Sequence, residues 1–185
     1  MTPWKKLLTG CALAGAISLA SPVFADTLTY SALLTGAGET PPNQSTATGM
    51  ATFALTGNIL QINVTFSGLT GGPAAAAHIH CCAAQGTNAP VWVPFAGFPN
   101  TTSGTYTATI DLSTFAFSGG GTEAALIAGM NNGSAYTNIH DAEFPGGEIR
   151  GQITATPEPG TLLLLGTGAA GIASLVRRRI YPEHP

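Results

Sequence analysis

The sequence is poor in charged residues, and this excludes one broad class of protein. Only 8 % of its 185 residues are Asp, Glu, Lys or Arg, against roughly 25 % in an average soluble domain. Between residues 26 and 154, Arg150 is the single basic side chain and seven are acidic, a net charge of −6 (1 − 7). Nucleic-acid binding needs clustered Lys and Arg side chains, so we exclude a nucleic-acid partner.

Familiar catalytic motifs are also missing. The sequence contains no Gly-x-Ser-x-Gly, no phosphate-binding glycine loop and no His-Glu-x-x-His, the patterns of common hydrolase, nucleotide and zinc-protease sites. An apolar fraction of 44 %, with 8 % aromatic residues, is nevertheless enough to form a core. We therefore expect one domain of ordinary size that is not an enzyme.

The first 25 residues have the pattern of a secretory signal peptide. A basic pair, Lys5–Lys6, precedes an uncharged stretch at 7–20 that is rich in Leu, Ala, Ile and Gly. Val23 and Ala25 then provide small residues at positions −3 and −1 of a cleavage site. This predicts export and processing by signal peptidase.

The other end carries a second apolar segment. Pro157-Glu158-Pro159 is followed by an apolar run, Thr161 to Val176, and then by Arg177, Arg178 and Arg179. Sixteen residues are fewer than the roughly 20 that a straight helix needs to span a bilayer, but snorkelling arginines can extend a short span. Basic residues stay cytoplasmic, so we expect a transient membrane anchor with the domain outside.

These three parts, in this order, resemble a PEP-CTERM sorting signal over residues 156–179. The resemblance implies a temporary anchor that is recognised by an exosortase, a membrane transpeptidase that cleaves near Pro-Glu-Pro. It also implies a Gram-negative bacterium that makes exopolysaccharide. The six residues at 180–185 depart from the pattern, because such signals usually end at the arginines. An ordinary single-span anchor is the alternative.

The middle of the chain, 26–155, alternates between apolar and polar residues with the period of a β-strand. Ala51–Leu55 and Leu60–Phe66 flank the turn residues Gly57-Asn58, which predicts a hairpin. A helix is expected only at Glu123–Met130, with Thr122 as its N-cap. Four further strands are predicted, the first as an edge strand between prolines: Val91–Val93, Tyr106–Leu112, Tyr136–His140 and Glu148–Ile153. The pattern predicts an all-β domain, an antiparallel β-sandwich.

The domain has three histidines, His78, His80 and His140. Residues i and i+2 of a strand share a face, so His78 and His80 project together. With His140 from another strand they would form a three-nitrogen site suited to Cu or Zn. The alternative is a polar strand face on which the imidazoles are hydrogen-bonded to their neighbours.

Cys81 and Cys82 follow the His-x-His segment directly. Thiols of an exported protein meet an oxidising compartment, and Cys11 leaves with the signal peptide. We expect a strained vicinal disulfide between them that clamps a loop. The alternatives are an inter-chain disulfide and thiolate ligands beside His80.

Two further features concern packing. Glu148 and Arg150 share a strand face, which predicts a structural ion pair near the last hairpin. Trp92 and Phe95 lie in a loop rich in Pro and Gly, where they either join the core or form an exposed rim for a partner or carbohydrate.

Four segments in order, 33–42, 77–80, 136–140 and 144–152, resemble the CHRD domain, a module repeated in chordin and present singly in bacterial exported proteins. The resemblance covers roughly residues 28–154 and implies an immunoglobulin-like β-sandwich without established catalysis. Its motifs fall on His78, His80, Asn138, His140, Gly147, Glu148 and Arg150. The Cys-Cys insertion and the single copy argue against carrying over growth-factor binding.

Two functions are expected from these features. The first is an exosortase-sorted protein of the cell surface or exopolysaccharide matrix whose non-catalytic domain binds a protein or a glycan. The second is an extracytoplasmic Cu- or Zn-binding protein that uses His78, His80 and His140. The His-x-His on a β-sandwich resembles Cu,Zn superoxide dismutase, which implies redox chemistry, but that enzyme needs more histidines and a bridging ligand.

Overall fold

The computed structural model describes residues 26–157, 166–173 and 176. The predicted signal peptide (1–25), Glu158 and Pro159, the arginines at 177–179 and the tail at 180–185 lie outside the described residues. Of the expected anchor at 161–176, residues 166–173 and 176 are helical. Among the residues that the structure describes, no helix is long and apolar enough to cross a membrane.

Within residues 26–157, nine strands form one antiparallel sheet, which is accompanied by the helix α1 and a 3-10 turn, η1. Their bounds are β1 Thr27–Thr35, η1 Gly36–Gly38, β2 Thr48–Thr56, β3 Ile59–Ser67, β4 Ala76–His80, β5 Val91–Pro94, β6 Gly104–Asp111, α1 Glu123–Asn132, β7 Tyr136–His140, β8 Ile149–Gln152 and β9 Thr154–Ala155. The strand order is β5-β4-β7-β8-β1-β2-β3-β6, and β9 pairs with β1.

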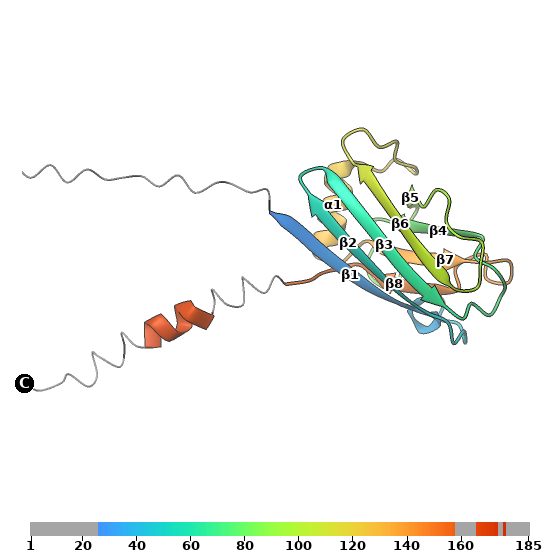
Figure 1. The fold of residues 1–185 in the computed structure, drawn as a ribbon, viewed down its shortest axis with the longest axis horizontal. Coiled ribbons are helices and arrows are strands. Elements are labelled where there is room, and N and C mark those ends of the chain that lie inside the picture. Colours follow the sequence, from blue (N-terminus) through green and yellow to red (C-terminus); the bar gives the residue numbers. More distant parts are fainter. Residues whose placement is uncertain (1–25, 158–165, 174–175, 177–185) are drawn as a thin grey trace, which may run out of the picture.

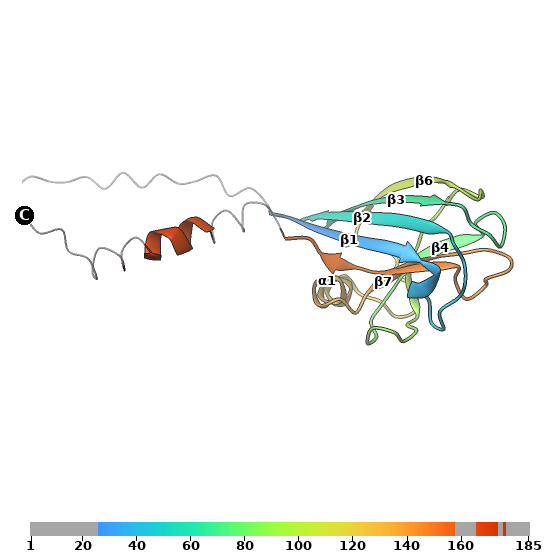
Figure 2. The ribbon, with the colours of Figure 1, turned by 90° about the horizontal axis from the view of Figure 1, so that it is seen from below.

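The sheet curls so that its two halves face each other (Figures 1 and 2). β1, β2, β3 and β6 make one layer, and β4, β5, β7 and β8 make the other. The layers join where Thr35 of β1 pairs with Arg150 of β8. The predicted all-β, antiparallel class is confirmed, and the two layers of the expected sandwich are halves of one bent sheet.

The β2–β3 hairpin shows why the alternating pattern produces this fold. Phe53 pairs with Ile62 and Leu55 with Leu60, and all four side chains are buried. The turn places Gly57 at φ 57°, a conformation that glycine adopts without a steric penalty. The intervening residues of both strands point outward, so one face of the layer builds the core and the other meets water.

The other predicted elements also form. β7 has the expected bounds, and β5 is an edge strand. The Thr122 hydroxyl accepts a hydrogen bond from the amide of Ala125 and so caps α1. Trp92, within β5, and Phe95, directly after it, are 9 % and 6 % exposed, so both belong to the core and do not form an exposed rim.

Every buried hydrophobic side chain among the described residues lies between Tyr30 and Ile153. Both layers and α1 contribute to this one core, for example through Leu126 and Met130 of α1. Residues 26–157 therefore contain a complete hydrophobic core, the property expected of a unit that folds on its own.

Candidate metal centre

The register of β4 and β7 brings the three histidines onto one outer face of the sheet. His78 pairs with Asn138, and His80 pairs with Tyr136. His140 pairs with Ala76, so it lies diagonally across from His78. Side chains in such positions are close enough to interact, and the cluster follows from strand pairing.

The imidazoles are close enough to share one ion. One ring nitrogen from each of His78, His80 and His140 lies within 4.8 Å of the others. His78 Nδ1 and His140 Nε2 lie 3.3 Å apart. His80 is buried, and the other two rings are half-buried.

Backbone carbonyls set the orientation of two of the rings. His80 Nδ1 lies 2.8 Å from the carbonyl oxygen of Ala89, and His140 Nδ1 lies 3.0 Å from that of Pro145. We assign a proton to each of these nitrogens, since a carbonyl can only accept. Both Nε2 atoms then present a lone pair, as in metal-bound histidines whose second nitrogen donates to a carbonyl. The buried His80 Nε2 has no hydrogen-bond partner.

Asn138 adds an oxygen to the same cluster. Its Oδ1 lies 2.9 Å from His140 Nε2, and its Nδ2 donates to Glu39 Oε1 at 3.5 Å. With the His140 proton on Nδ1, Oδ1 and Nε2 present lone pairs to each other, which is repulsive. A cation placed between them would turn that repulsion into coordination.

Electrostatics keep the cluster uncharged at neutral pH. Burial, with smaller contributions from His140 and His80, lowers the pKa of His78 to about 4. Burial is also the main reason that the pKa values of His80 and His140 are lowered. Because a metal binds the neutral imidazole, little proton competition remains at pH 7.

A stack of side chains supports His80. Its ring lies parallel to that of Tyr136, with centroids 4.6 Å apart and an interplanar angle of 5°. Arg150, from the strand on the other side of β7, places its guanidinium carbon 3.3 Å from the Tyr136 ring centroid. A cation over an aromatic face is attracted by the ring's negative potential. The stack therefore restrains the ring of His80.

The expected ion pair between Glu148 and Arg150 is wrong. Arg150 donates to the carbonyl oxygen of Thr87 at 2.9 Å and to Asn88 Oδ1 at 3.1 Å. Glu39, rather than Glu148, is the carboxylate whose charge acts on Arg150. Neighbours along the sequence do not show which loops cover the end of a strand.

Glu148 instead belongs to a buried polar cluster on the loop side of β8. Its carboxylate accepts hydrogen bonds from the hydroxyls of Ser45 (2.5 Å) and Thr70 (2.7 Å) and from the Thr70 amide (2.7 Å). These bonds and one to Asp141 lower the pKa of Glu148 to about 2, although its burial acts in the opposite direction. Burial and Glu148 raise the pKa of Asp141 to about 6. Glu148 is thus the stronger acid of the two, and its hydrogen bonds join the segments of Ser45 and Thr70 to β8.

Cys81 and Cys82 are joined by a vicinal disulfide. Cys81 is fully buried, and Cys82 Sγ lies 3.4 Å from the carbonyl oxygen of Ala125 in α1. A Cβ atom at Gly129 would collide with both sulfur atoms. The disulfide therefore packs against the helix, away from the three histidines.

Sequence reasoning brought the three histidines together but missed some of their neighbours. The period of two placed Asn138 on the strand face of His140. The same period extends this face to Tyr136, whose stack on His80 was not expected. Glu39 and the carbonyls of Ala89 and Pro145 come from loops, and no local pattern predicts their approach.

The model of the CHRD domain matches residues 30–153. The chain belongs to the CHRD family. All the histidines of the cluster, and the arginine that stacks on Tyr136, lie within the CHRD domain. Neither the curated proteins nor the solved structures contain a match to the chain.

The PEP-CTERM protein-sorting motif matches residues 155–179, directly after the CHRD domain. The chain is therefore an exported protein whose membrane-anchored precursor is processed by an exosortase. The domain itself ends where β9 pairs with β1, so sorting motif and fold meet at residues 154–156.

Proposed function

We propose that the CHRD domain is a non-catalytic, extracytoplasmic module that binds one Cu or Zn ion through His78, His80 and His140. The observation that carries this proposal is the convergence of three imidazole nitrogens within 4.8 Å. Asn138 Oδ1 is the fourth donor, because it already faces His140 Nε2 at 2.9 Å.

The spacing suits a small, nitrogen-rich coordination sphere. Two ligands held tetrahedrally at the usual Zn–N bond length lie about 3.3 Å apart, and His78 Nδ1 and His140 Nε2 are separated by 3.3 Å. His80 completes the site by a small inward shift, which also gives its buried Nε2 a partner. Imidazole sites of this kind generally favour Cu(II) over Zn(II) in affinity.

The three-histidine site is better suited to binding a metal ion than to catalysing a reaction. The site has three imidazoles and one amide oxygen, and a dismutase-type centre needs further histidines and a bridging ligand. We propose that the ion stabilises the outer face of β4 and β7 and the loops that contribute Ala89 and Pro145.

The proposal also includes the export and processing of the protein. Signal peptidase removes residues 1–25, the C-terminal segment anchors the precursor transiently, and exosortase releases the domain to the cell surface or extracellular matrix of a Gram-negative bacterium. An oxidising compartment on this route agrees with the disulfide between Cys81 and Cys82.

Metal content tests the proposal directly. Residues 26–157 are purified without chelator, exposed to Cu or Zn, desalted and analysed by elemental mass spectrometry. A His78→Ala/His80→Ala variant removes two ligands, and Asn63→Ala, on the exposed face of the other layer, is the control.

We expect close to one metal ion per chain in the wild type and in Asn63→Ala, and background metal in the double variant. Background metal in all three proteins would refute the metal site. Full loading of the double variant would place the ion elsewhere. Circular dichroism of each protein checks that loss of metal is not loss of fold.

A further inference from the structure

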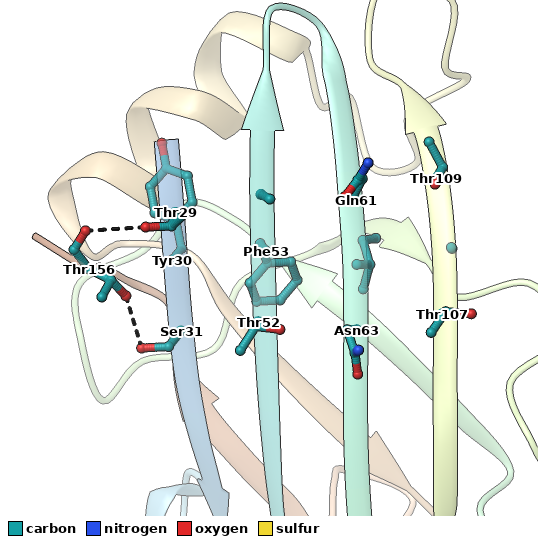
Figure 3. A pocket seen from close by; sticks show the side chains of 13 residues that line it. Thr29, Tyr30, Ser31, Thr52, Phe53, Gln61, Asn63, Thr107, Thr109 and Thr156 are labelled. Carbon is teal, nitrogen blue, oxygen red and sulfur yellow. Dashed lines mark hydrogen bonds between the residues drawn. The ribbon is translucent and has the colours of Figure 1, made fainter. Parts of the chain in front are cut away.

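The outer face of the other layer forms a broad groove of about 910 Å³ (Figure 3). It lies over β1, β2, β3 and β6, and the residue after β9, Thr156, stands at one side. Its floor is the backbone of residues such as Phe53 and Ile62, whose side chains point into the core. The groove is therefore a surface of the sheet and does not continue into the interior.

Strand register arranges the polar side chains of the groove in rows. One row runs across the four strands as Ser31, Thr52, Asn63 and Thr107. The next row is Thr29, Ala54, Gln61 and Thr109. Neighbouring strands are 4.7–4.9 Å apart, so each row is about 14 Å long.

Most of these groups have hydrogen-bonding capacity left. Thr29 and Ser31 exchange hydrogen bonds with Thr156 at the side of the groove. Within the described part of the chain, the remaining polar side chains of the rows form no hydrogen bond; they are Thr52, Gln61, Asn63, Thr107 and Thr109. Hydroxyls and amides that both donate and accept are thus presented to one ligand.

The chemistry of the groove restricts its occupant. No charged side chain lines it, so it offers nothing to select an ionic ligand. The side chains of the two rows include no aromatic residue, Met or Arg, which are the residues enriched in protein interfaces. At one end Leu33 and Met50 pair across β1 and β2 and are 63 % and 42 % exposed. This apolar area is small for a protein partner but fits the C–H face of a sugar ring.

We propose that this groove binds a neutral polysaccharide chain. Sugar hydroxyls, like the threonine, asparagine and glutamine side chains of the rows, both donate and accept hydrogen bonds. The threonine methyl groups supply apolar contacts between those bonds, and β-branched side chains lose little rotamer freedom on binding. The buried Trp92 and Phe95 are not available as a carbohydrate platform, which leaves the hydroxyl-rich face.

The groove is independent of the histidine cluster. It lies on β1, β2, β3 and β6, whereas the histidines lie on β4 and β7. Thr156 borders it and lies at the start of the sorting motif, which matches residues 155–179. Glycan binding and metal binding can therefore be tested separately, and loss of either leaves the other intact.

Affinity electrophoresis provides the test. Residues 26–157 migrate through native gels that contain hydroxyethylcellulose, dextran or mannan as neutral polymers, or alginate as the anionic polymer. The variant Gln61→Leu/Asn63→Leu removes two central amides at nearly constant size. Gln85→Leu, in an exposed loop outside the groove, is the matched control. Thermal unfolding of each variant checks its folding.

At least one neutral polymer is expected to retard the wild type and Gln85→Leu. Removal of two amides should weaken this binding about tenfold or more, at the usual contribution of a hydrogen bond. Retardation by alginate alone, retardation by none of the polymers, or undiminished retardation of the double variant would overturn the proposal. So would a dimer in sedimentation that Gln61→Leu/Asn63→Leu dissociates, because it would assign the face to a second copy.

Discussion

The lowered pKa values of the three histidines predict that acid destabilises the metal-free domain, and His78 has the most strongly defined contribution. In the folded state its pKa is about 4, whereas in the unfolded chain it is about 6.5. At a pH between these two values, the imidazole of His78 is protonated in the unfolded state and neutral in the folded state. The stability contributed by neutral His78 is therefore complete above pH 6.5 and is lost as the pH falls towards 4.

The difference between the two pKa values corresponds to about 3 kcal/mol, and solvent screening of the half-buried ring reduces it to about 2 kcal/mol. Two carboxyl groups oppose this loss. The pKa values of Glu39 and Asp141 are raised to about 7 and about 6. Each makes the folded state the better proton acceptor as the pH falls below its own pKa. The wild-type profile alone therefore does not isolate His78.

The contribution of His78 is isolated by comparison with His78→Gln, which does not titrate. Urea unfolding is followed by the fluorescence of Trp92, the single tryptophan of residues 26–157, with EDTA present at pH 7.5 and pH 4.5. We expect the wild type to lose about 2 kcal/mol more than His78→Gln over this interval. Parallel losses in the two proteins would show that the ring is not held neutral, and the argument would fail.

Three further predictions concern the packing of the disulfide, the contacts of Arg150 and the binding of zinc. Gly129→Ala should lower the free energy of unfolding by about 1–3 kcal/mol in urea titrations, because the added methyl group collides with the disulfide sulfurs. Alanine usually stabilises a helix relative to glycine, so a gain in stability would contradict this packing. Arg150→Met should lower the free energy of unfolding by about 2–3 kcal/mol, because it removes the stack on Tyr136 and two hydrogen bonds. Arg150→Lys should restore only part of this stability. An unchanged melting temperature for Arg150→Met would refute the prediction. Zinc at 100 times its dissociation constant should stabilise the wild type by about 2.7 kcal/mol. In differential scanning calorimetry it should leave the melting temperature of His80→Ala unchanged. Equal shifts of the melting temperature in both proteins would show that zinc binds at another site.

The local pattern of apolar and polar residues was sufficient to predict most of the strands and the helix. The period of two along Ala51–Leu55 and Leu60–Phe66, with Gly57 at the turn, determines a hairpin, because only one register buries all the apolar side chains. Thr122 and the apolar residues after it likewise determine α1. The His-x-His spacing places two imidazoles on one face before any partner strand is known.

The approach of His140 to His78 was decided by tertiary structure. It depends on the pairing of β4 with β7, two strands about 60 residues apart in the sequence, and the period of a strand does not determine which strand lies beside it. The loops that supply Ala89, Pro145 and Glu39 were equally unpredictable.

The contacts of Arg150 also depend partly on the sequence and partly on the tertiary structure. The sequence by itself determined that the one arginine of an acidic domain had to be compensated where it was buried. Carboxylates close in sequence were the natural candidates, yet the bend between β8 and β1 brings Glu39 into range, and β7 places Tyr136 beneath the guanidinium. Periodicity determines which face a side chain occupies, because it is a local property of the backbone. The neighbours on that face depend on how distant strands pair, which only the folded chain specifies.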